Sequence, residues 1–157
     1  MFLTHRLRGN ELLDEGTIVV CDALRESKVS RIEELDLSYN RIGLPGAESV
    51  AAYVAVTASL TEVDLRRNKF GTEGWCSIFD ALAKSTTSKI TKWELFHPGF
   101  GGEDIGPQGA KSLAAYLAVS TSLTKIDVRS IALGDDGKAA LRKAVEGRSA
   151  SGFELVL

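Results

Sequence analysis

Cysteine and histidine are scarce in this chain. Two cysteines, Cys21 and Cys76, and two histidines, His5 and His97, occur among 157 residues, and no Cys-x-x-Cys spacing is present. A disulfide framework or a zinc site needs more such residues at short, regular spacings. We therefore expect no metal and no cofactor. The small number of thiols suits a reducing compartment, and we expect a cytoplasmic location.

Long apolar runs are also missing. No stretch approaches the roughly 20 consecutive apolar residues that a membrane-spanning helix needs. The first ten residues lack the apolar segment of a signal peptide. We therefore expect neither secretion nor a membrane partner.

The chain has no excess of charge of either sign. Nineteen Lys and Arg residues stand against 21 Asp and Glu residues, which gives a formal net charge of −2. Such a balance provides no overall field to hold nucleic acid or an anionic membrane surface. A basic face interleaved with aromatic residues is missing too. We therefore expect no nucleic-acid partner.

Catalytic motifs are lacking as well. The chain contains no Gly-x-Ser-x-Gly, no Walker loop and no His-Glu-x-x-His. Its glycine-rich stretch at residues 99–102 does not open a helix, so it is a poor cradle for a phosphate group. His5 and His97 fall on predicted strands that lie well apart in stacking order. The sequence therefore predicts no catalytic residue and no enzyme activity.

What the chain does contain is a repeated strand–turn–helix unit, which is clearest in residues 32–46. Leu35 and Leu37 alternate with polar residues, and this period of two predicts a half-buried strand. Asn40 follows, where an asparagine can hydrogen-bond backbone groups left unpaired at the end of the strand. Pro45 suits the first turn of a helix. One unit cannot bury both its strand face and its helix stripe, but stacked copies can.

Five copies of this unit cover the chain, with no linker between them, so we expect a single domain over residues 1–157. Alternating strands and helices predict an α/β solenoid. It should have a parallel concave sheet of about six strands and about five helices on its convex side. Ile131 and Pro98 replace the asparagine in two copies, and about five residues are inserted after the fourth strand. The copies lie near residues 2–31, 32–59, 60–89, 90–122 and 123–152, followed by a terminal strand at 153–157.

The run from Leu35 to Ala47, Leu-Asp-Leu-Ser-Tyr-Asn-Arg-Ile-Gly-Leu-Pro-Gly-Ala, resembles the leucine-rich repeats of the ribonuclease-inhibitor type. This resemblance extends over essentially the whole chain. It implies a right-handed solenoid, an intracellular location and, for most members, protein binding without catalysis. The class includes ribonuclease inhibitors, the sensing ends of NOD-like receptors and Ran GTPase-activating proteins.

The sheet face turned away from the helices should carry lanes of polar side chains, each lane taking one residue from every strand. The central lane is mostly acidic, and neighbouring carboxylates about 5 Å apart repel by roughly 1 kcal/mol in water. Such a lane needs compensating cations, which are available two residues further along several strands. The central lane is Arg6, Asp36, Asp64, Glu94 and Asp127; beyond it lie Arg8, Ser38, Arg66, Phe96 and Arg129, and before it Thr4, Glu34, Glu62, Lys92 and Lys125.

Two interpretations of this face stay open. In the first, the lanes form a solvated surface that neutralises its own charges. In the second, the concave face as a whole is the docking surface for a protein. Residues at the turn edge would join such a surface, because Tyr and Arg are frequent interface anchors. The predicted partner-binding residues are Asp36, Tyr39, Asp64, Arg66, Arg67, Glu94, Phe96, His97, Phe100, Asp127 and Arg129.

The inserted segment, residues 97–104, is a second candidate for partner binding. A long loop that interrupts a repeat often lies on the binding side. Phe100 lies between glycines and has few local packing partners in the sequence. The alternative is that Phe100 folds back over Trp93 or Ile105 and covers the turn.

We consider three roles. The first is a non-enzymatic scaffold that binds a partner protein through the concave face and the segment 97–104. The second, which rests on fold analogy alone, is a GTPase-activating protein of the Ran-activator kind, or a sensing fragment of a NOD-like receptor. The third is a homodimer through the apolar terminal strand at 153–157, which would leave an unpaired sheet edge.

Overall fold

The structure is a computed structural model, which describes residues 3–95, 105–129, 131–148 and 152–157. Strands and helices alternate along the chain, as the repeats predict. The strands are β1 (Leu3–Arg6), β2 (Ile32–Asp36), β3 (Glu62–Asp64), β4 (Lys92–Glu94), β5 (Lys125–Asp127) and β6 (Glu154–Val156). The helices are α1 (Leu13–Glu26), α2 (Leu44–Val54), α3 (Gly71–Lys84), α4 (Gly106–Val119) and α5 (Gly134–Ala144).

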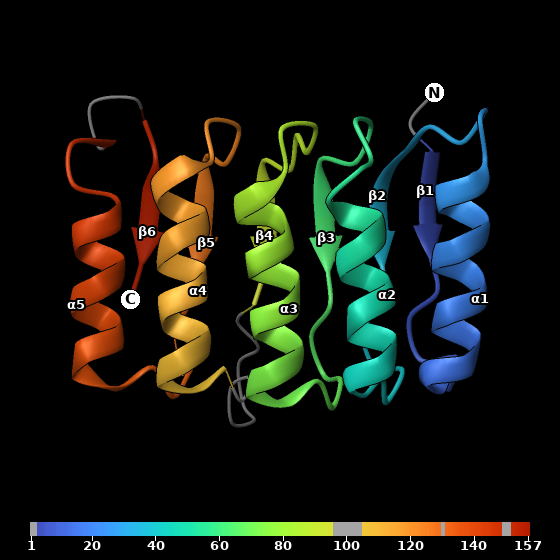
Figure 1. The fold of residues 1–157 in the computed structure, drawn as a ribbon, viewed down its shortest axis with the longest axis horizontal. Coiled ribbons are helices and arrows are strands. Elements are labelled where there is room, and N and C mark those ends of the chain that lie inside the picture. Colours follow the sequence, from blue (N-terminus) through green and yellow to red (C-terminus); the bar gives the residue numbers. More distant parts are fainter. Residues whose placement is uncertain (1–2, 96–104, 130, 149–151) are drawn as a thin grey trace.

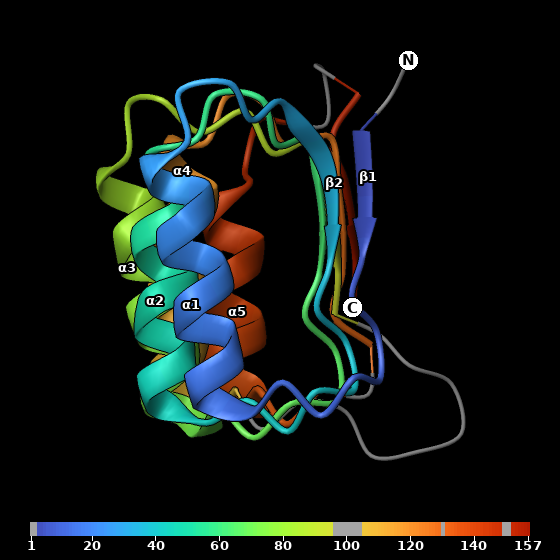
Figure 2. The ribbon, with the colours of Figure 1, turned by 90° about the vertical axis from the view of Figure 1, so that its right-hand side faces the viewer.

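All the strands belong to one parallel sheet, and their order in space is their order in the chain. Figure 1 shows the helices side by side in the same order, in front of the sheet. Figure 2, turned by 90°, shows that every helix covers the same face of the sheet and leaves the other face open. The predicted α/β solenoid is therefore confirmed.

The core lies between the sheet and the helices. Leu35, Val63, Trp93 and Ile126 stand in register on adjacent strands, and each is at most 1% exposed. Their side chains face the apolar stripes of the helices. Burying a side chain of this size contributes about 1.5–3 kcal/mol relative to leaving it in water. Because each repeat supplies only a few such residues, the core exists only when neighbouring repeats are stacked.

Aromatic rings fill the middle of this core. Trp75 stacks on Phe79 with ring centroids 5.5 Å apart, and Phe70 meets Trp75 edge-on at 5.0 Å. Phe79 then contacts Trp93 at 6.0 Å, which links α3 to β4. Trp75 and Phe79 follow each other by one helical turn, so the helix period alone brings these rings together.

Small residues near the helix starts let neighbouring helices approach closely. A side chain at Gly74 of α3 would come within 3.0 Å of the Ala47 Cβ on α2 and within 2.9 Å of the Phe70 Cβ. Gly137 of α5 has the same relation to Ala110 of α4, at 2.8 Å. These distances are too short for any Cβ atom, so glycine at this repeat position sets the spacing between helices.

Candidate protein-interaction surface

The face of the sheet turned away from the helices, called the open face below, carries the predicted lanes in the predicted register. Asp36 pairs with Asp64 on the next strand, and Glu94 pairs with Asp127. Leu35, the residue before Asp36, is fully buried on the helix side, whereas Asp36 itself is half-buried. The aspartates therefore point away from the core, and the period-two prediction for the strands is confirmed.

Two of these aspartates are neutralised by an arginine two residues further along. Asp64 accepts hydrogen bonds from Arg66 through the backbone N–H at 3.0 Å, Nε at 2.9 Å and Nη2 at 2.6 Å. Asp127 has the same arrangement with Arg129, at 3.1 Å, 3.0 Å and 2.7 Å. The predicted compensation along the strand is thus confirmed for these two carboxylates, and each holds a guanidinium with both of its oxygens.

The acid–base behaviour of the second pair reflects this contact. Partial burial opposes ionisation of Asp127, but the hydrogen bonds and charge of Arg129 outweigh it, so the pKa of Asp127 lies below its usual value. The hydrogen bond that Arg129 donates to Asp127 in turn raises the pKa of Arg129. This pair stays ionised at neutral pH and is satisfied within the chain.

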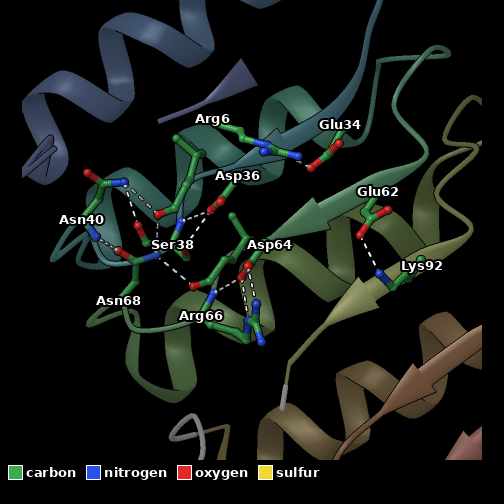
Figure 3. A network of polar contacts seen from close by, with 12 residues as sticks. Arg6, Glu34, Asp36, Ser38, Asn40, Glu62, Asp64, Arg66, Asn68 and Lys92 are labelled. Atoms are coloured by element: carbon green, nitrogen blue, oxygen red, sulfur yellow. Dashed lines mark hydrogen bonds and ion pairs between the residues drawn. The ribbon is translucent and has the colours of Figure 1, made fainter. Parts of the chain in front are cut away.

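Asp36 differs from both, because residue 38 is a serine instead of an arginine. The Ser38 backbone N–H and hydroxyl both donate to Oδ1 of Asp36, at 2.9 Å and 2.6 Å. Among the described residues, no cation lies within ion-pair distance of Asp36, and its Oδ2 accepts no hydrogen bond. Figure 3 shows Asp64 paired with Arg66, whereas the dashed contacts of the neighbouring Asp36 lead to Ser38.

The lane on the other side of the aspartates also pairs charges across strands. Lys92 Nζ lies 2.6 Å from Glu62, and Lys125 Nζ lies 2.9 Å from Glu154. Lys92 and Lys125 are direct neighbours on β4 and β5, but their side chains reach in opposite directions, Lys92 to Glu62 on β3 and Lys125 to Glu154 on β6. A shallow hollow of about 250 Å³ lies beside them, lined by these lysines, Trp93 and Asp127. Most charges on this face are therefore already matched.

Tyr39 and Arg67, at the turn edge of the open face, are two of the five non-glycine residues in the described chain that have strained backbones; the others are Glu11, Leu13 and Arg41. Tyr39 and Arg67 have left-handed backbone conformations, with φ of 60° and 62°. Gly9 occupies the corresponding position of the first repeat, where the same conformation carries no side-chain penalty. The strain costs roughly 1–2 kcal/mol per non-glycine residue. Arg8 covers the Tyr39 ring at 4.5 Å, so this predicted anchor is held in place by a neighbouring repeat.

An asparagine ladder lies directly behind this edge. The Asn40 side chain is fully buried; its oxygen accepts from the backbone N–H groups of Asn10 and Leu12, and its nitrogen donates to three carbonyls. Asn68 repeats the pattern one unit later, accepting from the N–H groups of Asn40 and Ile42. The predicted role of asparagine at the end of each strand is confirmed. The ladder also ties the first three repeats together, which the sequence prediction did not include.

Sequence reasoning missed a second ladder at the other end of the strands. Thr61, Thr91 and Thr124 each come directly before a strand and donate the side-chain hydroxyl to a backbone carbonyl of the preceding repeat, at 3.1 Å in all three cases. The acceptors are the carbonyls of Glu33, Thr61 and Thr91. The signal was present in the sequence as a threonine after the first apolar residue of three repeats.

Two further inter-repeat contacts were also missed. Asp14 on α1 accepts hydrogen bonds from the N–H groups of Gly43 at 2.7 Å and Gly46 at 3.1 Å, so it caps the start of α2 from the neighbouring helix. Arg148 donates to the carbonyls of Leu117 at 2.8 Å and Leu123 at 2.9 Å and covers the Phe153 ring at 4.2 Å. No sequence motif marks either contact, because the hydrogen-bond partners lie 25 to 32 positions away in the chain.

The structure brings some of the predicted binding residues together and leaves others outside its description. Asp36 and Asp64 are neighbours, whereas Asp127 lies two strands beyond Asp64. Glu94 is placed by its backbone in β4. Phe96, His97 and Phe100, with the segment 97–104, lie outside the described residues. Within the described ranges, no group of three or more His, Cys, Asp or Glu is arranged to hold a metal ion. None of the described helices has both the length and the apolar character to cross a membrane.

Comparison with known proteins follows the same repeats. A family model described as Leucine Rich repeat matches residues 32–51 and 58–75. Ribonuclease inhibitor from Mus musculus is 30% identical over 135 residues, which are 86% of this chain and 28% of that protein. NACHT, LRR and PYD domains-containing protein 12 from Mus musculus is 30% identical over 83% of this chain and 12% of its own length. RAN GTPase-activating protein 2 from Arabidopsis thaliana is 26% identical over 84% of this chain and 23% of its own length. The chain therefore spans less than a third of each of these relatives.

Proposed function

We propose that this chain, whose units are leucine-rich repeats of the ribonuclease-inhibitor type, is a non-enzymatic scaffold that binds a partner protein through the open face of its sheet. The relatives named above include an inhibitor of one protein and an activator of another. The identity of the partner and the face that it contacts are parts of the proposal.

The observation that carries the proposal is the construction of the open face. Side chains on it are fixed in register by the sheet, and among the described elements none covers it, whereas the opposite face lies under every helix (Figure 2). A row of charged and hydroxyl side chains on a rigid support provides specificity through complementary charge.

The turn edge extends this surface. Tyr39 and Arg67 lie at this edge in left-handed conformations where the first repeat uses glycine, and residues strained in this way cluster at binding sites. Segment 97–104 begins three residues after the end of β4 in the sequence, so we include Phe100 and its neighbours in the proposed surface.

A capture experiment tests which face binds. The open-face variant carries Arg6→Glu, Glu34→Lys and Lys125→Glu, and the helix-face control carries Glu48→Lys, Lys84→Glu and Lys111→Glu, all exposed positions on helices with the same net change in charge. Proteins captured from the native lysate by the unaltered chain should be lost from the open-face variant and kept by the control. Loss from the control instead, with both variants folded by circular dichroism, would contradict the proposal.

The GTPase-activating alternative makes a separate prediction. An activator must place a residue that orients the attacking water or neutralises the transferred phosphate. We therefore expect no acceleration when the chain is added to a small GTPase of the Ran class in a single-turnover GTP-hydrolysis assay. Acceleration that the open-face variant lacks would replace the scaffold role by an activating one.

Self-association through the terminal strand stays a separate prediction. β6 lies at one end of the sheet, where Phe153 is buried and Leu155 and Leu157 are half-buried against the core. In the described residues β6 pairs with β5 alone. Light scattering over a range of concentrations tests for a dimer, and a monomer at every concentration would remove this role.

A further inference from the structure

We infer that the Asp36 carboxylate is a binding site for a guanidinium group, called the seat below, and that an arginine of the partner protein occupies it on binding. This inference rests on the proposed function and names one contact within it. It follows from a comparison of three carboxylates that occupy the same place in three repeats, Asp36, Asp64 and Asp127.

The three carboxylates share their first set of hydrogen bonds. In each, Oδ1 accepts the backbone N–H of the residue two positions further along, at 2.9 Å, 3.0 Å and 3.1 Å. In each, Oδ1 also accepts a second donor from that residue's side chain, which is the hydroxyl of Ser38 or the Nε of Arg66 or Arg129. The backbone therefore presents all three carboxylates in the same orientation.

The three carboxylates differ in the contacts of their second oxygen, Oδ2. Oδ2 of Asp64 accepts Nη2 of Arg66 at 2.6 Å, and Oδ2 of Asp127 accepts Nη2 of Arg129 at 2.7 Å. The serine side chain has no second donor, so Oδ2 of Asp36 has no such partner among the described residues. Two of the three equivalent carboxylates hold a guanidinium from their own chain, whereas no guanidinium from the described ranges contacts the third.

The neighbouring cations are engaged elsewhere. Arg66 is held by Asp64, and the Arg6 side chain is 75% exposed and 3.9 Å from Glu34 (Figure 3). Arg8 lies over the ring of Tyr39. Ser38 is fully buried, whereas Asp36 is half-buried, so a partner can reach the Asp36 carboxylate from outside the sheet. Asp36 also faces Asp64 across the strands, and an added cation relieves the repulsion between the two carboxylates.

Arginine is the favoured occupant because the chain itself shows the fit. A planar guanidinium engages both oxygens of Asp64 and of Asp127, whereas a lysine ammonium is a point charge without that fork. A partner arginine that approaches from outside the sheet would place its terminal nitrogen where Nη2 of Arg66 lies in the next repeat.

The test uses a peptide with one arginine, acetyl-Gly-Arg-Gly-amide, titrated into the full chain and followed by backbone amide NMR. The Ser38 amide, which donates to Asp36, should shift in a saturable way at millimolar peptide. The same peptide with citrulline in place of arginine should produce no saturable shift. Asp36→Asn should weaken the arginine peptide by roughly tenfold or more, because a charge-assisted pair is lost.

The chain's own repeats supply matched variants. Ser38→Arg copies the third repeat and should close the seat, which abolishes the shift at residue 38. Arg66→Ser copies the second repeat and should open a new seat, seen as a saturable shift at the amide of residue 66. No saturable shift in the unaltered chain, or a shift that survives Asp36→Asn, would overturn the inference, and so would the absence of a new seat in Arg66→Ser.

The outcome is separable from that of the proposed function. The open-face capture variant leaves Asp36 intact, so loss of partner in that variant supports the open face without reference to the seat. If the captured partner binds Asp36→Asn as well as the unaltered chain, the seat is not used and the inference fails while the scaffold role stands. If the arginine peptide occupies the seat but capture depends on the helix face, the scaffold proposal fails and the seat remains only as a peptide site.

Discussion

The first three repeats and the last two share a fold but are joined by different contacts. In the first three repeats, buried Asn40 and half-buried Asn68 link the carboxyl ends of the strands, because each side chain accepts hydrogen bonds from the backbone of the preceding repeat. In the fifth repeat Ile131 takes the asparagine position and is 6% exposed, and Arg148 instead links α4, β5 and Phe153 from the other edge. We call the polar contacts between two neighbouring repeats a joint. The difference teaches that stacking requires the backbone groups at each joint to be hydrogen-bonded, but that different residues can provide those hydrogen bonds.

The largest expected effect comes from breaking the asparagine joint. Asn40→Ala leaves the buried N–H groups of Asn10 and Leu12 without their acceptor and three carbonyls without a donor. We expect the free energy of unfolding to fall by about 3 kcal/mol or more, measured by urea denaturation. In contrast, Ile131→Asn should not restore stability in the last repeats, because it replaces a buried apolar side chain. A gain of stability in that variant would show that the two joints are interchangeable.

A smaller loss should follow from removing the arginine joint. Arg148→Ala deletes two hydrogen bonds to backbone carbonyls and the contact with Phe153, and we expect a loss of about 2 kcal/mol. Hydrogen exchange should show the opening confined to α5 and β6, with β2 and β3 still protected. Arg148→Lys keeps the charge but not the fork and serves as the control, with an intermediate loss expected. Equal loosening of both halves would contradict a local joint.

The capping contact of Asp14 allows a paired comparison between the two regions. Asp14→Ala removes the acceptor for two N–H groups at the start of α2, and we expect a loss of about 1 kcal/mol. Asp135 occupies the same repeat position on α5 and is exposed. Asp135→Ala should therefore leave the melting temperature nearly unchanged. Similar losses in the two variants would mean that charge near the helix start, and not the inter-repeat cap, is responsible.

The smallest effect concerns pH and the closed pair Asp127–Arg129. Because the folded pKa of Asp127 lies below its usual value, the pair's stabilisation is fully present above the unfolded pKa of about 3.9 and is lost as the pH falls through the lower, folded pKa. Asp127 is half-buried but Arg129 is exposed to solvent, which screens the pair, so the change in unfolding free energy should be small. In Arg129→Ala, carboxyl NMR should show the pKa of Asp127 moving up towards its usual value. An unchanged pKa would show that Arg129 does not control this carboxylate.

The sequence predicts the backbone arrangement of this molecule better than it predicts which side chains meet. Period two in the strands and the spacing of Leu35, Leu37 and Asn40 depend on local geometry, so the lanes and their register follow from the repeat length. The contacts of Asp14 and Arg148 join residues about 25 to 32 positions apart and depend on how neighbouring repeats settle against each other.

The same limit applies to the site. The residues two positions beyond each aspartate were predicted to compensate its charge, and for Arg66 and Arg129 they do so. Within the described part of the chain, Oδ2 of Asp36 accepts no hydrogen bond, and this follows only from the hydrogen-bond geometry, because a serine and an arginine both satisfy Oδ1. The sequence therefore predicts the surface, and the structure distinguishes its closed carboxylates from its open one.

The most direct test of the account is carboxylate footprinting of the chain with and without its captured partner. Labelling with a carbodiimide and a soluble amine, followed by mass spectrometry, reports which Asp and Glu side chains the partner covers. We predict protection of Glu34, Asp36 and Glu62 on the open face, with Glu48, Asp80 and Asp136 on the helices labelled as before. Protection of the helix carboxylates, with labelling of the open face unchanged, would contradict the account.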